Sequence, residues 1–375
     1  NCHTRPKFVD SSTGKAHPYC SKSCATAAKQ NTSALCVICH VRPKRVDGTR
    51  MHDYCSKSCA QKASTPPTQI LMVSCTHGRN LPDLIVAIVK GICQIPGCTK
   101  PVHKNPTGPP GRYCGLAHKQ LAETACLYCR KAQKQGDRHF CGQGCADEAT
   151  KKSPMILEVP EDHQTFKSVE AQFQTSWRHV GRTCPTVRHI YKIVSSQSSV
   201  DKYSAYRDTV EARGHFVASG RSAGNENRRW HGTRRECRLG DKSCTAFCSS
   251  TSCSLCCIMR TSYDVTLWGK KTGWGRQLTC VLRFGAGIYT SSTSSKSNDY
   301  AQNTDSSAPL KAILLNKVVV GKGYKMTQDN TSMTAPPAGF DSVLAEKGAR
   351  LNHDELVVYC NEAIRPSYLV MYDAC

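Results

Sequence analysis

The cysteines of this chain recur at regular spacings, and this pattern constrains the fold more than any other feature of the sequence. The 375 residues include 25 cysteines, of which 15 lie in residues 1–150. The clearest unit pairs Cys36 with Cys39, continues with Arg-Pro-Lys and ends in Tyr-Cys-Ser-Lys-Ser-Cys at residues 54–59. A unit with so few apolar residues cannot build a core without cross-links or metal.

Four copies of this unit are visible, each with cysteines or a histidine at corresponding positions. The candidate ligands are Cys2, Cys20 and Cys24; Cys36, Cys39, Cys55 and Cys59; Cys93, Cys98, Cys114 and His118; and Cys126, Cys129, Cys141 and Cys145. The first cysteine of the first copy is expected to precede Asn1, so we expect the sequence to be truncated at its start.

Zinc explains these spacings better than disulfides do. A Cys-x2-Cys turn presents two sulfurs to one tetrahedral ion, and a second pair spaced by three residues lies on one face of a helical turn. In the third copy His118 replaces the last cysteine, a change that zinc accepts and a disulfide cannot. The aromatic residue before the third ligand is expected to supply the small core of each unit.

The repeat resembles treble-clef fingers of the kind found in MYND-like modules, where a similar Tyr-Cys-Ser sequence occurs. Two interpretations stay open: the fingers either hold a small scaffold together or bind a protein or nucleic acid. Residues 1–150 carry 21 basic and 8 acidic side chains, a balance of 21 − 8 = +13 within a total of +23. Such an excess favours a polyanionic partner such as DNA or RNA. The longest apolar stretches are far too short to span a bilayer, so no membrane association is expected.

The regular cysteine pattern stops after the fourth repeat, and we expect a linker at 151–160 that precedes a second domain at 161–375. Apolar residues at helical spacing predict a helix from Phe166 to Trp177. Alternation predicts a strand over Val187–Val194, and a second helix is plausible over Tyr203–Ala212.

Several motifs then follow in a fixed order. They are His231-Gly232-Thr233, Gly285-Ala286-Gly287-Ile288-Tyr289, Ser295-Lys296-Ser297-Asn298-Asp299-Tyr300 and Glu355-Leu356-Val357-Val358-Tyr359. This ordered set resembles the catalytic domain of the poly(ADP-ribose) polymerase family, the diphtheria-toxin-like ADP-ribosyltransferases. The resemblance covers roughly residues 160–375 and implies an α+β fold, with a split, mainly antiparallel sheet, flanking helices and an NAD cleft.

The resemblance also implies roles for individual side chains. His231 would hold a ribose hydroxyl, Tyr289 and Tyr300 would sandwich the nicotinamide ring, and Glu355 would bind the nicotinamide ribose and orient the acceptor. The backbone of Gly232 and the hydroxyl of Ser297 would hold the carboxamide, and Thr233 would also belong to the NAD site. Each residue has a simpler alternative: Tyr289 as core packing, Glu355 as an exposed strand-edge charge. His353 and Asp354 are expected to be solvated neighbours.

One cluster departs from the family, a cysteine-rich insertion at residues 237–257. Cys244, Cys248, Cys253 and Cys256 have plausible zinc spacing, and a disulfide pair or a small buried core is the rival interpretation. Tankyrases hold a zinc ion in the catalytic domain, but after the Gly-Ile-Tyr strand rather than before it.

These observations predict an enzyme that transfers ADP-ribose from NAD to protein or nucleic-acid acceptors and releases nicotinamide, with structural zinc. The complete His-Tyr-Glu set permits polymer formation. The alternative is a zinc-finger adaptor or nucleic-acid-binding protein with a catalytically silent transferase fold. Many thiolates indicate a reducing compartment, nucleus or cytosol, and the charge favours the nucleus.

Overall fold

A computed structural model of the chain describes most of its C-terminal part and a short stretch near the N-terminus. The described residues are 44–47, 50–56, 91–104, 108–268, 283–348 and 351–374. The chain divides into two units, residues 1–74 and 75–375. In the first unit, β1 (Val46–Asp47) and β2 (Arg50–Met51) form a short antiparallel hairpin.

The second unit contains a five-stranded antiparallel sheet with the strand order β3-β4-β13-β9-β5. Its strands are β3 (Met155–Val159), β4 (Val187–Val194), β5 (Glu226–Gly232), β9 (Leu310–Val319) and β13 (Ile364–Asp373). The central strands β9 and β13 carry nearly continuous apolar runs because both faces of the sheet are covered. The strand predicted over Val187–Val194 is confirmed.

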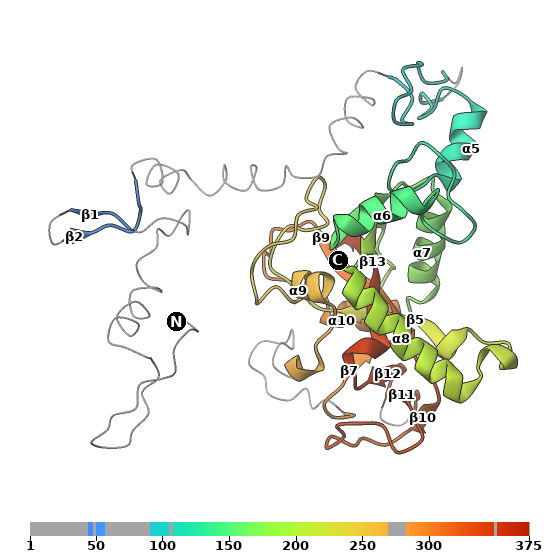
Figure 1. The fold of residues 1–375 in the computed structure, drawn as a ribbon, viewed down its shortest axis with the longest axis vertical. Coiled ribbons are helices and arrows are strands. Elements are labelled where there is room, and N and C mark those ends of the chain that lie inside the picture. Colours follow the sequence, from blue (N-terminus) through green and yellow to red (C-terminus); the bar gives the residue numbers. More distant parts are fainter. Residues whose placement is uncertain are drawn as a thin grey trace, which may run out of the picture. The chain divides into compact units, whose positions relative to one another are not determined.

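Helices cover the two faces of this sheet, and α7 and α9 lie on opposite sides of β13 (Figure 1). The helices are α7 (Gln164–Thr175), α8 (Gln197–Gly214) and α9 (Ser254–Thr261). On the α7 face, Phe173 packs against Trp230 and Tyr372. On the α9 face, Leu255 and Met259 pack against the strands. Both predicted helices exist, and α8 is longer than its predicted core.

A second sheet of four strands has the order β10-β11-β12-β7. Its strands are β7 (Ile288–Thr290), β10 (Gly323–Met326), β11 (Ser342–Ala345) and β12 (Glu355–Val358), and α10 (Ser294–Tyr300) follows β7. The pair β10–β11 is parallel and the other two pairs are antiparallel. A bridge between Trp230 and Ser291 joins this sheet to the end of β5. The predicted α+β class with a split, mainly antiparallel sheet is therefore confirmed.

Smaller elements complete the unit. They are β6 (Arg234–Arg235), β8 (Gln302–Asn303), and the 3-10 helices η1 (Val217–Ser219), η2 (Ala223–Asn225), η3 (Val265–Leu267) and η4 (Asn361–Ala363). Arg235 is only 1% exposed, and its guanidinium donates to Asp241 at 2.9 Å and to Asn303 at 3.0 Å. This buried, paired cation fixes the insertion to the sheet.

The last two cysteine repeats each end in the short helix that their spacing predicts. These helices are α5 (Leu116–Thr124) and α6 (Gln143–Lys151). The stretch 151–160 is not the expected linker, because residues 155–159 form β3 and pair with β4 along its length. Its apolar residues Ile156, Leu157 and Val159 are buried in the two faces of the sheet, which explains the difference.

The fourth repeat shares its core with the transferase-like sheet. Leu127 is 2% exposed and belongs to the α7-face core, where Phe140 also packs. His139 Nε2 lies 3.1 Å from the hydroxyl of Tyr368 in β13. Phe140 therefore packs against the core of the five-stranded sheet, whereas Tyr113 of the third repeat packs in its own unit, as predicted. Among the described residues, no helix combines the length and apolar character needed to cross a membrane.

Candidate active site

Three adjacent strands bring the predicted triad residues to one region. His231 lies in β5, which meets β7 at the Trp230–Ser291 bridge, and Tyr289 lies in β7. β7 pairs in turn with β12, where Val357 lies opposite Tyr289. Because side chains alternate along a strand, Glu355 shares a face with Val357 and so with Tyr289. Tyr289 and Glu355, which are 355 − 289 = 66 positions apart in the sequence, thus share one face of two adjacent strands.

His231 is fixed by its backbone neighbour across the bridge. Its Nδ1 atom lies 2.8 Å from the carbonyl oxygen of Tyr289, so Nδ1 carries the proton and donates it. The ring of Tyr263 packs edge-on against the imidazole with the centroids 5.2 Å apart. Burial lowers the pKa of His231 below its usual value, and the imidazole therefore stays neutral at pH 7 with Nε2 as an acceptor.

Tyr289 presents a ring whose hydroxyl is already engaged. The hydroxyl donates to the carbonyl of Gly285 at 2.9 Å and accepts from the amide of Phe284 at 3.0 Å. Burial raises the pKa of Tyr289 well above its usual range, and the nearby Glu355 and Tyr300 raise it further. This tyrosine is therefore suited to stacking rather than to proton transfer. The ring packs against the core around Phe284, which agrees with the simpler interpretation, and its role in the NAD site stays a prediction.

Glu355 opens β12 and forms an ion pair that the sequence analysis missed. Lys296 of α10 places its Nζ atom 2.6 Å from Glu355 Oε1, and the two side chains are 14% and 11% exposed. Lys296 Nζ also lies 3.4 Å from the carbonyl of His353. Glu355 is therefore not an exposed strand-edge charge. It is a largely enclosed carboxylate held in one orientation.

The Gly232 backbone approaches α10 more closely than any side chain would allow. A Cβ atom at this position would lie 1.8 Å from the carbonyl oxygen of Ser297. Ser297 is 4% exposed, and the carbonyl of Thr233 accepts from the amide of Gln302 at 3.2 Å. The end of β5 and the helix α10 thus form a narrow wall of backbone groups and a hydroxyl, which suits a flat amide-bearing ring.

Tyr300 ends α10 with its side chain 36% exposed. The charge of ionised Tyr300 is one of the influences that raise the pKa of Tyr289. The stacking of both rings on a nicotinamide stays a prediction.

Asp354 is not the solvated neighbour that we expected. Its carboxylate accepts from the amide of Ser292 at 3.0 Å and from the Ser292 hydroxyl at 2.6 Å, while the Ser291 hydroxyl donates to its backbone carbonyl at 2.9 Å. These bonds hold the start of β12 against the turn that precedes α10. His353 is likewise partly enclosed, with its ring 5.6 Å from that of His179.

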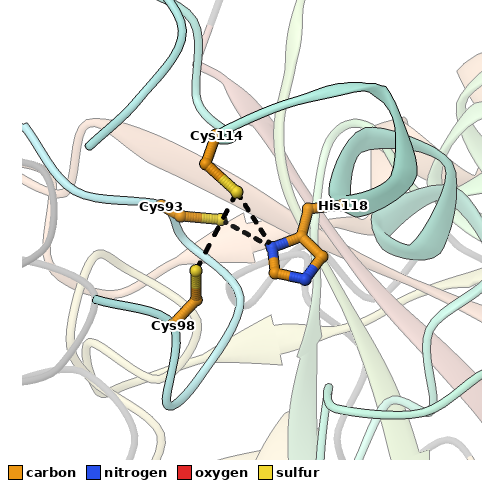
Figure 2. A group of neighbouring side chains, drawn as sticks. All are labelled: Cys93, Cys98, Cys114 and His118. Carbon is orange, nitrogen blue, oxygen red and sulfur yellow. Dashed lines mark hydrogen bonds between the residues drawn. The ribbon is translucent and has the colours of Figure 1, made fainter. Parts of the chain in front are cut away.

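Within the described part of the chain, three groups of four side chains have the arrangement of a zinc site. Figure 2 shows the first, in which Cys93, Cys98, Cys114 and His118 point toward one another. The sulfurs of Cys98 and Cys114 are 3.9 Å apart, and His118 Nδ1 lies 3.3 Å from the sulfur of Cys114. Sulfurs bound tetrahedrally at about 2.3 Å from zinc lie about 3.8 Å from one another, so this set fits the ion.

The second group consists of Cys126, Cys129, Cys141 and Cys145, as predicted from the repeat. Its sulfurs are 3.7 Å apart for Cys129 and Cys141 and 3.5 Å apart for Cys141 and Cys145. All four ligand atoms lie within 4.8 Å of one another. These distances fit the same tetrahedral geometry.

The third group lies in the insertion and differs from the predicted set at one position. Its members are Cys237, Cys248, Cys253 and Cys256. Cys237 replaces the predicted Cys244, which is disulfide-bonded. Cys237 lies two residues after the end of β6, and its sulfur lies 3.5 Å from that of Cys256 and 3.9 Å from that of Cys253. Spacing alone could not reveal this, because the cysteine that completes the group depends on how β6 positions the chain.

The first two repeats fall mostly outside the described residues. The candidate ligands Cys2, Cys20, Cys24, Cys36, Cys39 and Cys59 lie outside them. Cys55 is described and partly buried. Zinc binding by these repeats stays a prediction.

Comparison with known proteins agrees with the resemblance found in the motifs. Residues 271–349 match the family model for the poly(ADP-ribose) polymerase catalytic domain. This segment contains Tyr289, Ser297 and Tyr300, whereas His231 and Glu355 flank it. The resemblance to the catalytic domain of the poly(ADP-ribose) polymerase family, found in the motifs, is therefore confirmed over this segment.

Two curated proteins are similar to this chain. The protein mono-ADP-ribosyltransferase PARP3 of Mus musculus is 27% identical over 188 residues, which are 48% of this chain and 27% of the relative. The protein of the same name from Homo sapiens is 28% identical over 163 residues, which are 43% of this chain and 22% of the relative. The chain therefore spans about a quarter of the length of these relatives.

Proposed function

We propose that this chain transfers ADP-ribose from NAD to an acceptor and releases nicotinamide. The observation that carries the proposal is the enclosed Glu355 carboxylate on the same face as the Tyr289 ring, one strand away from a neutral His231. The relatives that share up to about half of this chain are named as mono-ADP-ribosyltransferases, which supports the same reaction class.

The residues divide the task between binding and charge stabilisation. NAD supplies a nicotinamide that leaves as a neutral group, so positive charge develops on the ribose, as in glycoside cleavage. The wall formed by Gly232 and Ser297 would grip the carboxamide, and Tyr289 and Tyr300 would hold the ring. His231 Nε2 would accept a ribose hydroxyl, and Glu355 would face the developing charge.

Lys296 holds Glu355 in one orientation before the donor binds. A carboxylate that is only 11% exposed would be costly to leave unpaired, and the ammonium 2.6 Å away removes that cost. When an acceptor hydroxyl or ribose hydroxyl approaches Glu355, the same lysine can hold the carboxylate in place. Lys296 is therefore a positioning residue in this proposal.

A labelling assay with the Glu355→Gln variant tests the proposal. We expect transfer of label from NAD, and release of nicotinamide, to fall at least about hundredfold, which corresponds to roughly 2.7 kcal/mol of transition-state stabilisation. The melting temperature should change little because the amide is isosteric. Glu346→Gln is the matched control, since Glu346 pairs with Lys325 on an exposed surface. Equal labelling in Glu355→Gln and wild type would refute the assignment.

Gel electrophoresis of the labelled protein distinguishes a single ADP-ribose unit from a polymer. The complete His231, Tyr289 and Glu355 set favours polymer, which would appear as a smear above the labelled band. The names of the two relatives favour a single unit, which would appear as a discrete band.

We also propose that the three four-residue groups hold structural zinc. Four ligands without an open position are typical of structural rather than catalytic zinc. In the third group, Cys253 and Cys256 are fully buried beside Leu239 and Met371, so the ion would fasten the insertion to the α9 face of the sheet.

The N-terminal repeats are proposed to direct the enzyme to a polyanion, in keeping with a nuclear location. The support is the balance of +13 over residues 1–150. We expect the full chain to bind duplex DNA or RNA with an affinity that falls at least tenfold between 50 and 200 mM salt, measured by fluorescence anisotropy. An affinity insensitive to salt would contradict this, and would favour protein acceptors as the partners of the repeats.

A further inference from the structure

A row of cations crosses the α7 face of the five-stranded sheet, one from each of four neighbouring strands. They are Lys192 of β4, Arg365 of β13, Lys317 of β9 and Arg228 of β5. Lys317 lies directly opposite Arg365 on one side and Arg228 on the other. Like charges that face each other across strands are destabilising, so this arrangement calls for an explanation.

The inner part of the row is largely removed from water. Lys192 is 9% exposed, and its ammonium donates to the carbonyl of Ser367 at 3.1 Å. The same ammonium lies 5.0 Å from the centre of the Tyr368 ring, and the Arg228 guanidinium lies 5.9 Å from that centre. Tyr368 thus forms a floor against which two of the four cations pack.

These cations have few acceptors among the described residues. The ion pair between Lys317 and Glu226, at 2.7 Å, is the only one that joins a member of the row to a described carboxylate. Arg228 makes one long hydrogen bond, at 3.5 Å, to the side chain of Gln172 in α7.

Arg365 is the least satisfied member of the row. Its guanidinium packs over the Tyr203 ring of α8 at 5.3 Å, and its Nε atom is buried without a hydrogen-bond partner in the described structure. Because the guanidinium of Arg365 contacts the ring through its flat face, the N–H groups at its edge can still donate hydrogen bonds to a ligand. A buried donor without an acceptor is unfavourable, so an acceptor that reached this atom would stabilise the protein.

We propose that this row is a binding site for a phosphate group. Arg228, Arg365 and Lys317 against one carboxylate leave a local balance of 3 − 1 = +2, which suits a multiply charged oxyanion better than a single carboxylate. Burial and the three neighbouring cations lower the pKa of the fourth group, Lys192, well below its ordinary value, and an anion beside it would oppose that shift. Guanidinium forks bind phosphate oxygens through paired hydrogen bonds, and Arg228 and Arg365 provide two such forks on either side of Lys317.

The proposed phosphate site is separate from the NAD cleft. Along β5, Arg228 and Trp230 alternate with Arg229 and His231, so the row and His231 lie on opposite faces of the sheet. The site therefore goes beyond the proposed transfer reaction and does not depend on it.

Thermal unfolding of the full chain in the presence of inorganic phosphate tests this proposal, with chloride holding the ionic strength constant. For the wild type we expect the melting temperature to rise saturably with phosphate. In Arg228→Met, whose side chain is exposed and whose loss should be tolerated, the half-saturating concentration should increase at least tenfold. Arg228→Lys, which keeps the charge but loses the fork, should lie in between.

Lys325→Met is the control, because Lys325 is an exposed cation of β10 in the other sheet. It should respond to phosphate as the wild type does. The proposal is overturned if the wild type shows no saturable rise, or if Arg228→Met and Lys325→Met have the same half-saturating concentration.

A second arm replaces phosphate by AMP, in the Glu355→Gln background, to identify the source of the phosphate group. Equal half-saturating concentrations for phosphate and AMP, both dependent on Arg228, indicate recognition of the free ion. Tighter binding of AMP that also depends on Arg228 indicates a nucleotide phosphate. If the half-saturating concentration of AMP is the same with and without the Arg228→Met substitution, AMP binds in the donor cleft. That result contradicts the recognition of a nucleotide phosphate by the row of cations.

Discussion

Gly232 occupies a position where the backbone itself forms the site. The strand β5 ends against α10 so closely that even a methyl group at residue 232 would overlap the Ser297 carbonyl and approach the Ala301 amide at 2.8 Å. The resemblance assigned this glycine to the carboxamide end of NAD, and the geometry gives an independent reason for its small size.

The Gly232→Ala variant is therefore expected to lose both activity and stability. Because backbone atoms on both sides must move, we expect a destabilisation of about 1–3 kcal/mol and a larger relative loss in labelling from NAD. Gly348→Ala is a suitable control, since a Cβ there would meet no atom within 4 Å. Thermal unfolding and NAD labelling measure the two effects. A Gly232→Ala enzyme with wild-type KM for NAD would exclude this residue from the donor site.

At the residue scale, the sequence predicted members of the site but not their partners. The motifs pointed to His231, Tyr289 and Glu355, which the fold brings to adjacent strands. Lys296 was passed over because it lies between two serines in a helix, and only the packing of α10 against β12 directs it to Glu355.

At the scale of elements, the donor region depends on one short connection between β12 and the turn before α10. Asp354 makes this connection through the Ser292 amide and hydroxyl. Since Glu355 is the next residue and Lys296 lies in the helix that follows, Asp354 holds both members of the ion pair in position.

Asp354→Asn is predicted to lower kcat/KM about tenfold and to destabilise the protein by about 1–2 kcal/mol, because charged acceptors form stronger hydrogen bonds than amides. Steady-state kinetics and thermal unfolding provide the measurements. Asp329→Asn removes the carboxylate of an exposed ion pair with Arg283 and should leave both quantities nearly unchanged. If the two variants behave alike, Asp354 has no positioning role.

Long periodic elements were predictable, and short ones were not. The strand Val187–Val194 and the helix near Phe166 have clear periodicity because one side of each packs on a core. The prediction of a linker over β3 was wrong because the two lysines and the proline before it resemble a domain boundary. Its five residues are too few to show a clear periodicity, and pairing with β4 is what makes them a strand.

At the scale of the whole molecule, the fourth cysteine repeat belongs to the transferase-like core. Leu127 lies in the same cluster as Trp230 and Tyr368, and His163, at the start of α7, bonds through Nε2 to the carbonyl of Ala125 at 3.0 Å. The sequence could not reveal this, because a repeat suggests an independent unit and nothing local shows what its apolar residues contact.

Loss of metal from the fourth repeat should therefore unfold more than the repeat. We expect Cys141→Ser to reduce bound zinc by one equivalent and to lower the free energy of unfolding of the catalytic unit by at least about 3 kcal/mol. Metal analysis by mass spectrometry and thermal unfolding test this. Cys257→Ser, outside the three ligand groups, is the control. An unchanged melting temperature would show that the repeat and the sheet fold independently.

The shared core of the fourth repeat and the sheet has a consequence for how long the protein would remain active in a cell. An oxidant or a chelator that attacked Cys141 or Cys145 would not need to enter the proposed NAD cleft. It would still unfold the fourth repeat and so remove Leu127 from the cluster that contains Trp230. The rate of inactivation would then depend on cysteine oxidation and on the concentration of free zinc in the cell, rather than on chemical damage to the residues of the proposed active site.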